Sequence, residues 1–379
     1  MRSAILVGAS IFGSAFAAAI PAALGSPSVY PALTDKSQLP AVFKLARGSL
    51  SNAPPPPQGA LSADAITSLQ FIEFNELFES AFFLSLLANV TNNVPGFQIN
   101  DQDERNYVID SITAIVAQEE LHAINADNAL RSQLAPTIQP CTYKYGTTSF
   151  VDAITFAALF TDVVLGTLQD VIQLLAISKD VGLTRGVAAS LGQEGQQSGF
   201  FRLVENRNKI PSEQPFLTTS TRDFAFSALQ QNVIVSCPND SILKNKLKLY
   251  APLNVLTTNI PAADQTLNFS IDINTIATSN VFKPASGSWS AYGKTFNAAY
   301  DWSQTSIVYI NSQNLPVVVK PTNVKVAGTV ISFSANFPQN TNLMNGLTLA
   351  ALTHTAGPFP NASSVADATL FGPGLIEVN

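Results

Sequence analysis

Two short segments of the sequence place ligand-type side chains at the spacing of a metal site. The first, EELH at 119–122, sets Glu119 three residues before His122. On a helix this spacing puts both side chains on one side of one turn, where a carboxylate and an imidazole suit a metal ion between helices. The second, EGQQ at 194–197, repeats the spacing from Glu194 but ends in the amide of Gln197.

Both segments lie on apolar stripes with helical spacing. The stripe of Glu119 and His122 contains Ile112, Ile115, Val116, Ala123 and Ala126, and the stripe of Glu194 and Gln197 contains Leu183, Val187, Leu191 and Phe201. Burying these polar groups alone would be expensive, so we expect them to meet partners. Further carboxylates come from two other segments: Glu76 or Glu79 from 62–89, and Asp162 from 149–179.

The ligand set is incomplete. Gln197 offers a neutral amide, a poorer ligand for iron or manganese than imidazole, and Asp162 is one methylene shorter than glutamate. Two interpretations follow. One iron or manganese ion is held near Glu119, His122 and a bridging glutamate, or the same groups form a buried polar network without metal.

Other titratable residues fit this pattern less well. Glu73 and Glu120 lie off the apolar stripes, so we expect them in solvent. His354, in LTHTAGP, has no recognisable nucleophile context and is expected at the surface or in a loop.

These residues must be positioned by long helices. Apolar periodicity and stop signals predict helices over 62–89, 104–134, 149–179 and 183–206, which need one another to bury their faces and so predict a four-helix bundle. The third is apolar enough to resemble a membrane span, but Asp152, Asp162 and Asp170 argue for a buried bundle helix and no membrane span.

The sequence changes character after Cys237. Segments 265–273, 305–312 and 315–335 are rich in Val, Ile, Thr and Phe with period-two alternation, and turn residues separate them. The predicted fold class is α+β: a bundle over 62–237 and a β-rich, sandwich-like domain over 238–379.

Several features predict export. Residues 1–19 resemble a signal peptide, and 20–61 form an arm with the proline spacer SNAPPPPQG. Cys141 and Cys237, the two cysteines, are expected to form a disulfide. Four glycosylation sequons stand at Asn89, Asn239, Asn268 and Asn361. With 26 acidic against 20 basic residues, nucleic acid is a poor partner candidate.

The pattern of these segments resembles the four ligand-bearing helices of the ferritin-like superfamily. The segments that carry the resemblance are NELFESAFF at 75–83, EELH at 119–122, the segment with Asp162, and EGQQ at 194–197. The signal, spacer and β-rich tail resemble secreted late sexual development and stress-response proteins of filamentous fungi, distant relatives of plant desiccation-related proteins. The resemblance implies a di-metal site in which Glu76 and Glu194 are bridging carboxylates and Glu119, His122 and Asp162 are further ligands. Because Gln197 and the short Asp162 depart from the family pattern, we expect this di-metal site to be degenerate and without redox catalysis.

The resemblance also implies a secreted protein of the cell surface, wall or spore matrix, made during stress or sexual development and not acting as a redox enzyme. Two alternatives stay open. One is an extracellular iron- or manganese-dependent oxidase or peroxide-handling enzyme that uses the bundle site. The other is a module whose β-rich tail binds a partner or a glycan.

Overall fold

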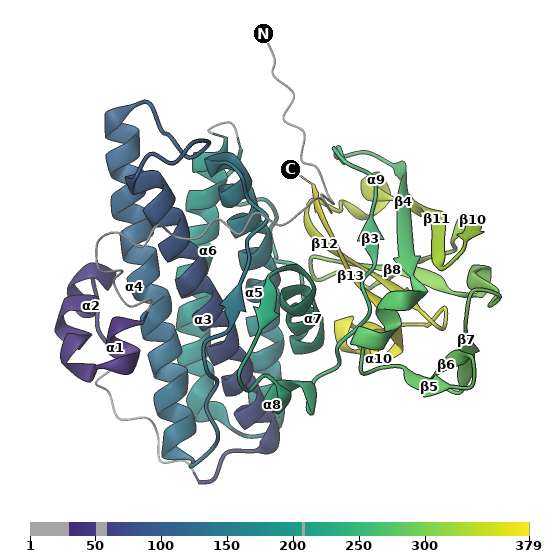
Figure 1. The fold of residues 1–379 in the computed structure, drawn as a ribbon, viewed down its shortest axis with the longest axis horizontal. Coiled ribbons are helices and arrows are strands. Elements are labelled where there is room, and N and C mark those ends of the chain that lie inside the picture. The colour runs from purple at the N-terminus through teal and green to yellow at the C-terminus, as the bar shows by residue number, and fades with distance from the viewer. Residues whose placement is uncertain (1–29, 51–58, 207–208, 379) are drawn as a thin grey trace.

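The computed structural model describes residues 30–50, 59–206 and 209–378 and has an α+β architecture. Long helices make up the N-terminal half and several β-sheets the C-terminal part (Figure 1). The predicted signal peptide and the proline run of the spacer lie outside the described residues.

The four long helices match the predicted segments to within about two residues at most ends. They are α3 (Ala63–Thr91), α4 (Gln102–Ser132), α5 (Phe150–Ile177) and α6 (Val181–Glu205). Three of them begin at a side chain that accepts a hydrogen bond from the first turn: Ser62, Asp101 and Ser149. These caps satisfy backbone donors that have no partner within the helix.

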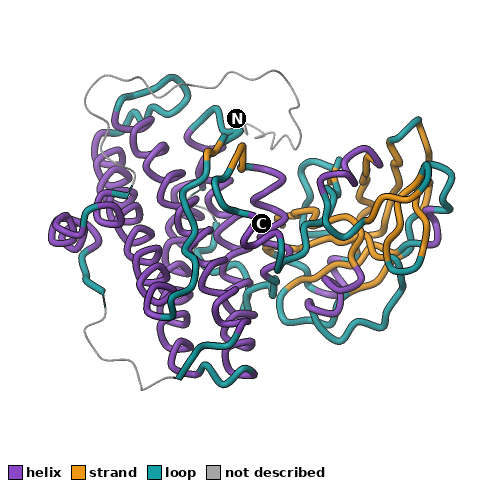
Figure 2. The backbone as a smooth tube through the Cα atoms, turned by 60° about the horizontal axis from the view of Figure 1, so that its bottom comes forward, coloured by secondary structure: helices purple, strands orange, loops and turns teal. Residues whose placement is uncertain are grey.

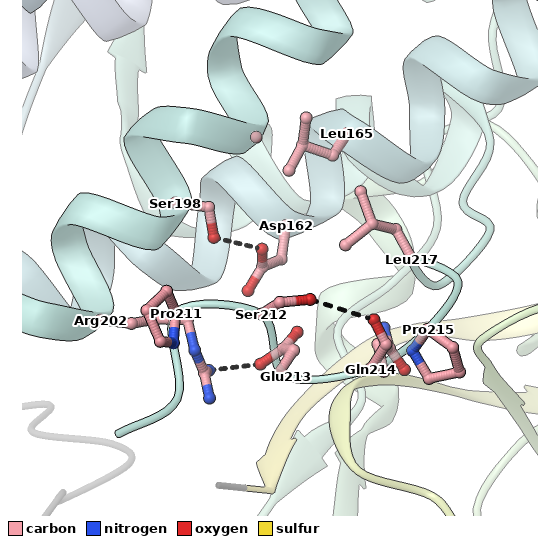
Figure 3. A pocket seen from close by; sticks show the side chains of 11 residues that line it. Asp162, Leu165, Ser198, Arg202, Pro211, Ser212, Glu213, Gln214, Pro215 and Leu217 are labelled. Atoms are coloured by element: carbon pink, nitrogen blue, oxygen red, sulfur yellow. Dashed lines mark hydrogen bonds and ion pairs between the residues drawn. The ribbon is translucent and has the colours of Figure 1, made fainter. Parts of the chain in front are cut away.

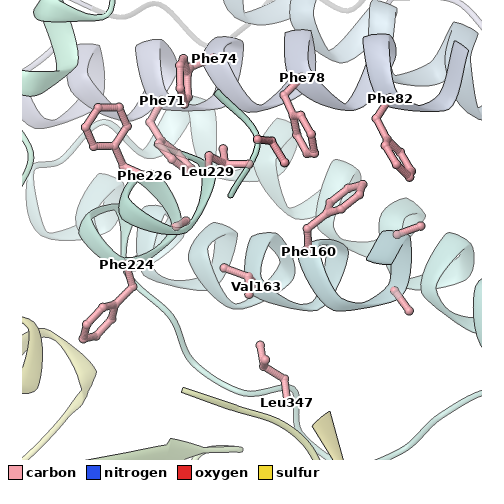
Figure 4. Packing of buried hydrophobic residues seen from close by; sticks show 14 of the residues in the cluster. Phe71, Phe74, Phe78, Phe82, Phe160, Val163, Phe224, Phe226, Leu229 and Leu347 are labelled. Atoms are coloured by element: carbon pink, nitrogen blue, oxygen red, sulfur yellow. The ribbon is translucent and has the colours of Figure 1, made fainter. Parts of the chain in front are cut away.

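The four helices pack as a bundle in which α3 contacts α4, and α5 contacts α6, most extensively. An aromatic row on α3 fills the space between α3 and α5. Phe74, Phe78 and Phe82 recur every four residues and point from α3 toward Phe160 of α5 and toward Phe226 of α7 (Arg222–Asn232) (Figure 4). Because these rings recur with the helical period, they fix the rotation of α3 about its axis. That rotation also determines the directions of the glutamates on the same helix, such as Glu76 and Glu79.

Helix α5 is long and apolar enough to cross a membrane, by length and composition. In the structure, 72% of its most apolar 18-residue window is buried by the rest of the chain. A core helix of a folded bundle has this property, and the packing against α3 and α6 accounts for the composition of α5.

The N-terminal segment contains two short α-helices where the sequence predicted only an arm. Helices α1 (Pro31–Thr34) and α2 (Leu39–Ala46), with the 3-10 turn η1 (Lys36–Gln38), pack on α4. Val42 and Ala46 join Leu121 and Ile124 of α4 in one apolar cluster. This segment therefore covers a face of α4 that would otherwise be exposed.

The remaining elements are mostly strands and short helical turns. They are β1 (Thr142–Tyr143), β2 (Ile234–Ser236), α8 (Ser241–Lys244), β3 (Asn254–Val255), β4 (Gln265–Asp272), η2 (Ile273–Thr278), β5 (Lys283–Ala285), β6 (Ser288–Ala291), β7 (Lys294–Phe296), η3 (Trp302–Gln304), β8 (Ser306–Asn311), β9 (Val317–Val319), β10 (Thr322–Ala327), β11 (Val330–Phe337), α9 (Gln339–Asn342), β12 (Gly346–Thr353), α10 (Ala362–Ala368) and β13 (Thr369–Val378).

Two antiparallel four-stranded sheets dominate the β-rich part. Their strand orders are β10-β11-β4-β3 and β13-β12-β8-β9. A three-stranded sheet, β5-β6-β7, is smaller. The predicted strands at 265–273 and 305–312 correspond to β4 and β8, and the predicted run at 315–335 is divided among β9, β10 and β11.

The sheet β13-β12-β8-β9 lies between the helices and the second large sheet (Figure 1). Figure 2 shows the strands of the β-rich part gathered on one side of the long helices. On β8, Val308 and Ile310 join the apolar cluster of the helices, whereas Ile307 and Tyr309 join the cluster shared with the second sheet. Every residue of β8 and β12 is buried. The middle sheet is thus covered on both faces, which explains its nearly continuous apolar sequence.

The predicted disulfide between Cys141 and Cys237 is present. The two half-cystines border the small antiparallel pair β1-β2, in which Thr142 faces Ser236. The bond therefore ties the connection between α4 and α5 to the segment that leads from α7 into the β-rich part, across a sequence separation of 96.

Candidate metal centre

Four of the predicted ligands converge from three helices. Glu76 of α3, Glu119 and His122 of α4, and Glu194 of α6 each offer one ligand atom within 4.8 Å of the others. His122 Nδ1 is the common point. It lies 2.9 Å from Glu119 Oε2, 3.5 Å from Glu76 Oε2 and 3.7 Å from Glu194 Oε1. The i,i+3 spacing on α4 places glutamate and histidine on one turn, as predicted.

The carboxylates of this cluster are inside the protein. Glu76, Glu119 and Glu194 are at most 1% exposed, and 16% of the His122 side chain is exposed. Glu76 Oε2 and both carboxylate oxygens of Glu194 have no hydrogen-bond partner. Buried oxygens without partners are expensive. Two of these atoms, Glu76 Oε2 and Glu194 Oε1, lie within 3.7 Å of His122 Nδ1, so the donor set fits a cation bound by three carboxylates and one imidazole.

Burial and mutual repulsion change the protonation of the cluster. Burial raises the pKa of Glu76 to about 7 although His122 opposes the shift, and burial with neighbouring carboxylates raises the pKa of Glu194 well above its usual range. Burial alone would lower the pKa of His122, but Glu119 and Glu76 raise it well above the ordinary value. Without a bound cation, an imidazolium ion therefore neutralises part of the negative charge.

Glu79 and Gln197 complete the surroundings. Glu79 is 2% exposed, its Oε1 has no partner, and burial with the nearby carboxylates of Glu119 and Glu76 raises its pKa well above the usual range. Gln197 Nε2 donates to Glu119 Oε1 and, at 3.5 Å, to Gln118 Oε1. The Gln197 amide is therefore a hydrogen-bond donor to Glu119, one of the grouped carboxylates.

The structure separates Asp162 from this cluster. Asp162 accepts a hydrogen bond from Ser198 Oγ at 3.0 Å and groups with Glu213 and Glu377 instead. Ser198 follows Glu194 by one helical turn on α6, so Asp162 lies at a different level along the bundle. The prediction that Asp162 shares one centre with Glu76 and Glu194 therefore does not agree with this arrangement.

Two further glutamates are buried, contrary to the sequence-based expectation. Glu73 is fully buried and accepts the Ile138 N–H at 2.7 Å. Glu120, 2% exposed, accepts the backbone N–H groups of Ala32 and Leu33 at 2.7 and 3.1 Å. Both act as anchors for loop or N-terminal backbone. No local signal indicated this, because their partners are distant in sequence.

The other predicted residues lie apart from the cluster. His354, in the β-rich part, is partly exposed and stacks on Tyr292 with a 4.2 Å ring separation. Among the sequons, Asn268 and Asn361 are exposed, whereas Asn89 and Asn239 are partly buried. The Asn239 amide already donates to Thr137 O and accepts from Gln139 N, which leaves it less available for a glycan. Glycosylation stays a prediction.

No family model matches the chain, and no curated protein matches it either. The assignment of function therefore depends on the geometry of the cluster and on the sequence.

Proposed function

We propose that this chain is a secreted, ferritin-like protein that binds one iron or manganese ion among its long helices. Its role would be that of a component of a cell surface, wall or spore matrix, without redox catalysis. The observation that carries the metal-binding part is the convergence of His122 Nδ1 with carboxylate oxygens of Glu76, Glu119 and Glu194.

The donor set favours these metals. Imidazole suits transition metals and carboxylates suit harder cations, so one imidazole with three carboxylates fits Fe²⁺ or Mn²⁺. A bound ion would need His122 with an unprotonated Nδ1, so uptake would release protons. The unpartnered oxygens of Glu76 and Glu194 would gain a partner.

Two observations support a non-redox role. One histidine is present among the grouped ligands, and Gln197 stands where a second would complete the pattern. Asp162, the carboxylate expected for a second ion, belongs to another group.

The disulfide between Cys141 and Cys237 is compatible with an oxidising, extracellular compartment.

The test is elemental analysis of protein purified from its native host without chelators. We expect about one equivalent of iron or manganese per chain. The sequence has two histidines, which supplies a matched pair of variants. His122→Ala should abolish the bound metal, whereas His354→Ala should retain it, because His354 stacks on Tyr292 in the β-rich part.

Addition of Fe²⁺ or Mn²⁺ to chelator-treated protein gives an independent readout. A ligand bound by the native state stabilises it by about 2.7 kcal/mol at a hundredfold excess over Kd. Metal-free protein whose melting temperature does not respond to either ion would contradict the proposal and favour the buried polar network. Two equivalents per chain with oxygen-dependent iron oxidation would favour the oxidase alternative.

A further inference from the structure

A second group of carboxylates consists of Asp162, Glu213 and Glu377. Two of its members, Asp162 and Glu213, line a cavity where α5, α6 and the segment 209–217 meet (Figure 3). The cavity has a volume of about 230 Å³. Its polar lining includes Asp162, Ser198, Arg202, Ser212 and Glu213. Asp162 and Glu213 point toward one another across it (Figure 3). At roughly 30 Å³ per water molecule, the cavity has room for a cation together with several waters.

Three carboxylates from different parts of the fold converge here. Asp162 of α5, Glu213 of the 209–217 segment and Glu377 of β13 each offer an oxygen within 4.8 Å of the others. Asp162 is 4% exposed, and the side chains of Glu213 and Glu377 are 5% and 18% exposed. The group therefore connects α5 and the 209–217 segment to β13, and Glu377 is its most exposed member.

Several oxygens of this group lack a partner. Ser198 satisfies Asp162 Oδ1, but Asp162 Oδ2 and Glu213 Oε1 are buried and accept no hydrogen bond. Neither oxygen of Glu377 accepts a hydrogen bond. Because unsatisfied buried oxygens are rare in native proteins, these atoms indicate a ligand that supplies positive charge.

The described residues place one guanidinium group among these carboxylates. Arg202 contacts Glu213 and lies 3.9 Å from Glu377 Oε1. Lys209, the other cation that acts on Asp162, is paired with Glu205 at 2.7 Å. Burial raises the pKa of Asp162 and of Glu377 well above the usual range, and a divalent cation bound beside them would favour their ionised forms.

We propose that one partly hydrated Ca²⁺ ion binds at the edge of this cavity, held by Asp162 and Glu213 from the cavity lining and by Glu377 beside them. The donors are all oxygens, which suits a hard cation rather than zinc or copper. Calcium takes oxygens at about 2.3–2.6 Å, so oxygens around one ion lie no more than roughly 5 Å apart, and the three oxygens of this group meet that condition because they lie within 4.8 Å of one another. Bound there, the ion would tie α5 and the 209–217 segment to β13.

The test is a titration of chelator-treated full-length protein with CaCl₂. Binding is measured by isothermal titration calorimetry and, independently, by the change in melting temperature. We expect one equivalent to bind and the melting temperature to rise. Asp162→Asn keeps the size and the acceptor for Ser198 but removes a charge, and should weaken Ca²⁺ binding at least about tenfold. Glu377→Gln, on a different element, should have the same effect.

The control is Asp170→Asn, which removes another buried carboxylate from α5. Asp170 is 7% exposed, accepts a hydrogen bond from Ser363 and does not line the cavity. This variant should bind Ca²⁺ as the wild type does. His122→Ala should also keep this binding, which separates the site from the iron or manganese centre. The proposal would be overturned if the wild type showed neither heat nor a thermal shift at millimolar Ca²⁺. It would also be overturned if Asp162→Asn and Glu377→Gln both bound Ca²⁺ as tightly as the wild type does.

Discussion

The side-chain amide of Gln197 on α6 donates a hydrogen bond to Oε1 of Glu119 on α4. The other oxygen of this carboxylate, Oε2, lies 2.9 Å from His122 Nδ1. Glu119 is therefore held from both sides, by an amide of one helix and an imidazole of its own. This relationship fixes the carboxylate at the centre of the candidate site, and it places residue 197 within reach of any ion bound there.

Gln197→His should bind about one more equivalent of Mn²⁺ than wild type, because an imidazole at this position adds a ligand beside Glu119 with little change of volume. The measurement is metal stoichiometry by elemental analysis after loading and desalting. Gln193→His is the matched control, since the Gln193 amide, one turn earlier on α6, donates to Gln118 and not to a carboxylate. Equal stoichiometry in the two folded variants would show that residue 197 does not face a metal.

Removal of the disulfide should destabilise the fold by about 4 kcal/mol, because the bond between Cys141 and Cys237 closes a long loop in the unfolded chain. The double variant Cys141→Ser with Cys237→Ser, compared with wild type in urea unfolding, measures this difference. Non-reducing peptide mapping provides the check on the starting protein. Two free thiols in the purified wild type would contradict the pairing.

Gly166→Ala should lower the free energy of unfolding by roughly 1–3 kcal/mol, because the segment 218–220 crosses α5 at this glycine. A Cβ atom there would stand 2.8 Å from Ser220 N and closer still to Thr218 O. Gly186→Ala, on exposed α6 surface with open space around the new methyl, should instead stabilise by roughly 0.5–1 kcal/mol. Thermal or urea unfolding of both variants tests the contrast in sign.

Glu73→Gln should flatten the pH dependence of stability. Burial raises the pKa of Glu73 from 4.5 to about 8, so the folded state keeps a proton that the unfolded state releases above pH 4.5. The free energy of unfolding therefore falls as pH rises from about 4.5 to 8, by up to about 1.4 kcal/mol per pH unit from this group. Glutamine keeps an acceptor for Ile138 N–H but has no proton to lose.

The measurement is urea unfolding at pH 5, 6, 7 and 8, and the expected result is a shallower slope for Glu73→Gln than for wild type. Asp103→Asn, which removes a carboxylate from the exposed first turn of α4, controls for the loss of one negative charge. Parallel slopes for Glu73→Gln and wild type would mean that Glu73 does not carry a buried proton.

The helices were predictable because their signals are local. Apolar periodicity and capping residues such as Ser62 and Ser149 place helix ends without knowledge of the rest of the fold. The spacing of Glu119 and His122 likewise determines that both side chains share one turn. Sequence therefore sufficed for the long helices and for the pair of ligands on α4.

The sequence predictions that disagree with the structure concern two things. One is which segment packs beside a helix, and the other is the level along the bundle at which a side chain lies. Glu120 faces away from the bundle, but α1 and α2 cover that face, and nothing near Glu120 in the sequence indicates them. Asp162 lies on a buried face of α5, yet its height along the bundle brings it to Ser198, one turn beyond Glu194. A helical stripe specifies direction around the axis but not the partner met along it.

The middle sheet also determines how the chain can come apart. Strands β8 and β12 contact the helices on one face and the second sheet on the other. Unfolding of the helices or of the second sheet would therefore expose one whole apolar face of the middle sheet. The helical half and the β-rich half should thus unfold in a single cooperative transition. Neither half is expected to be soluble when produced alone, so for expression and for recombination this protein behaves as one indivisible unit.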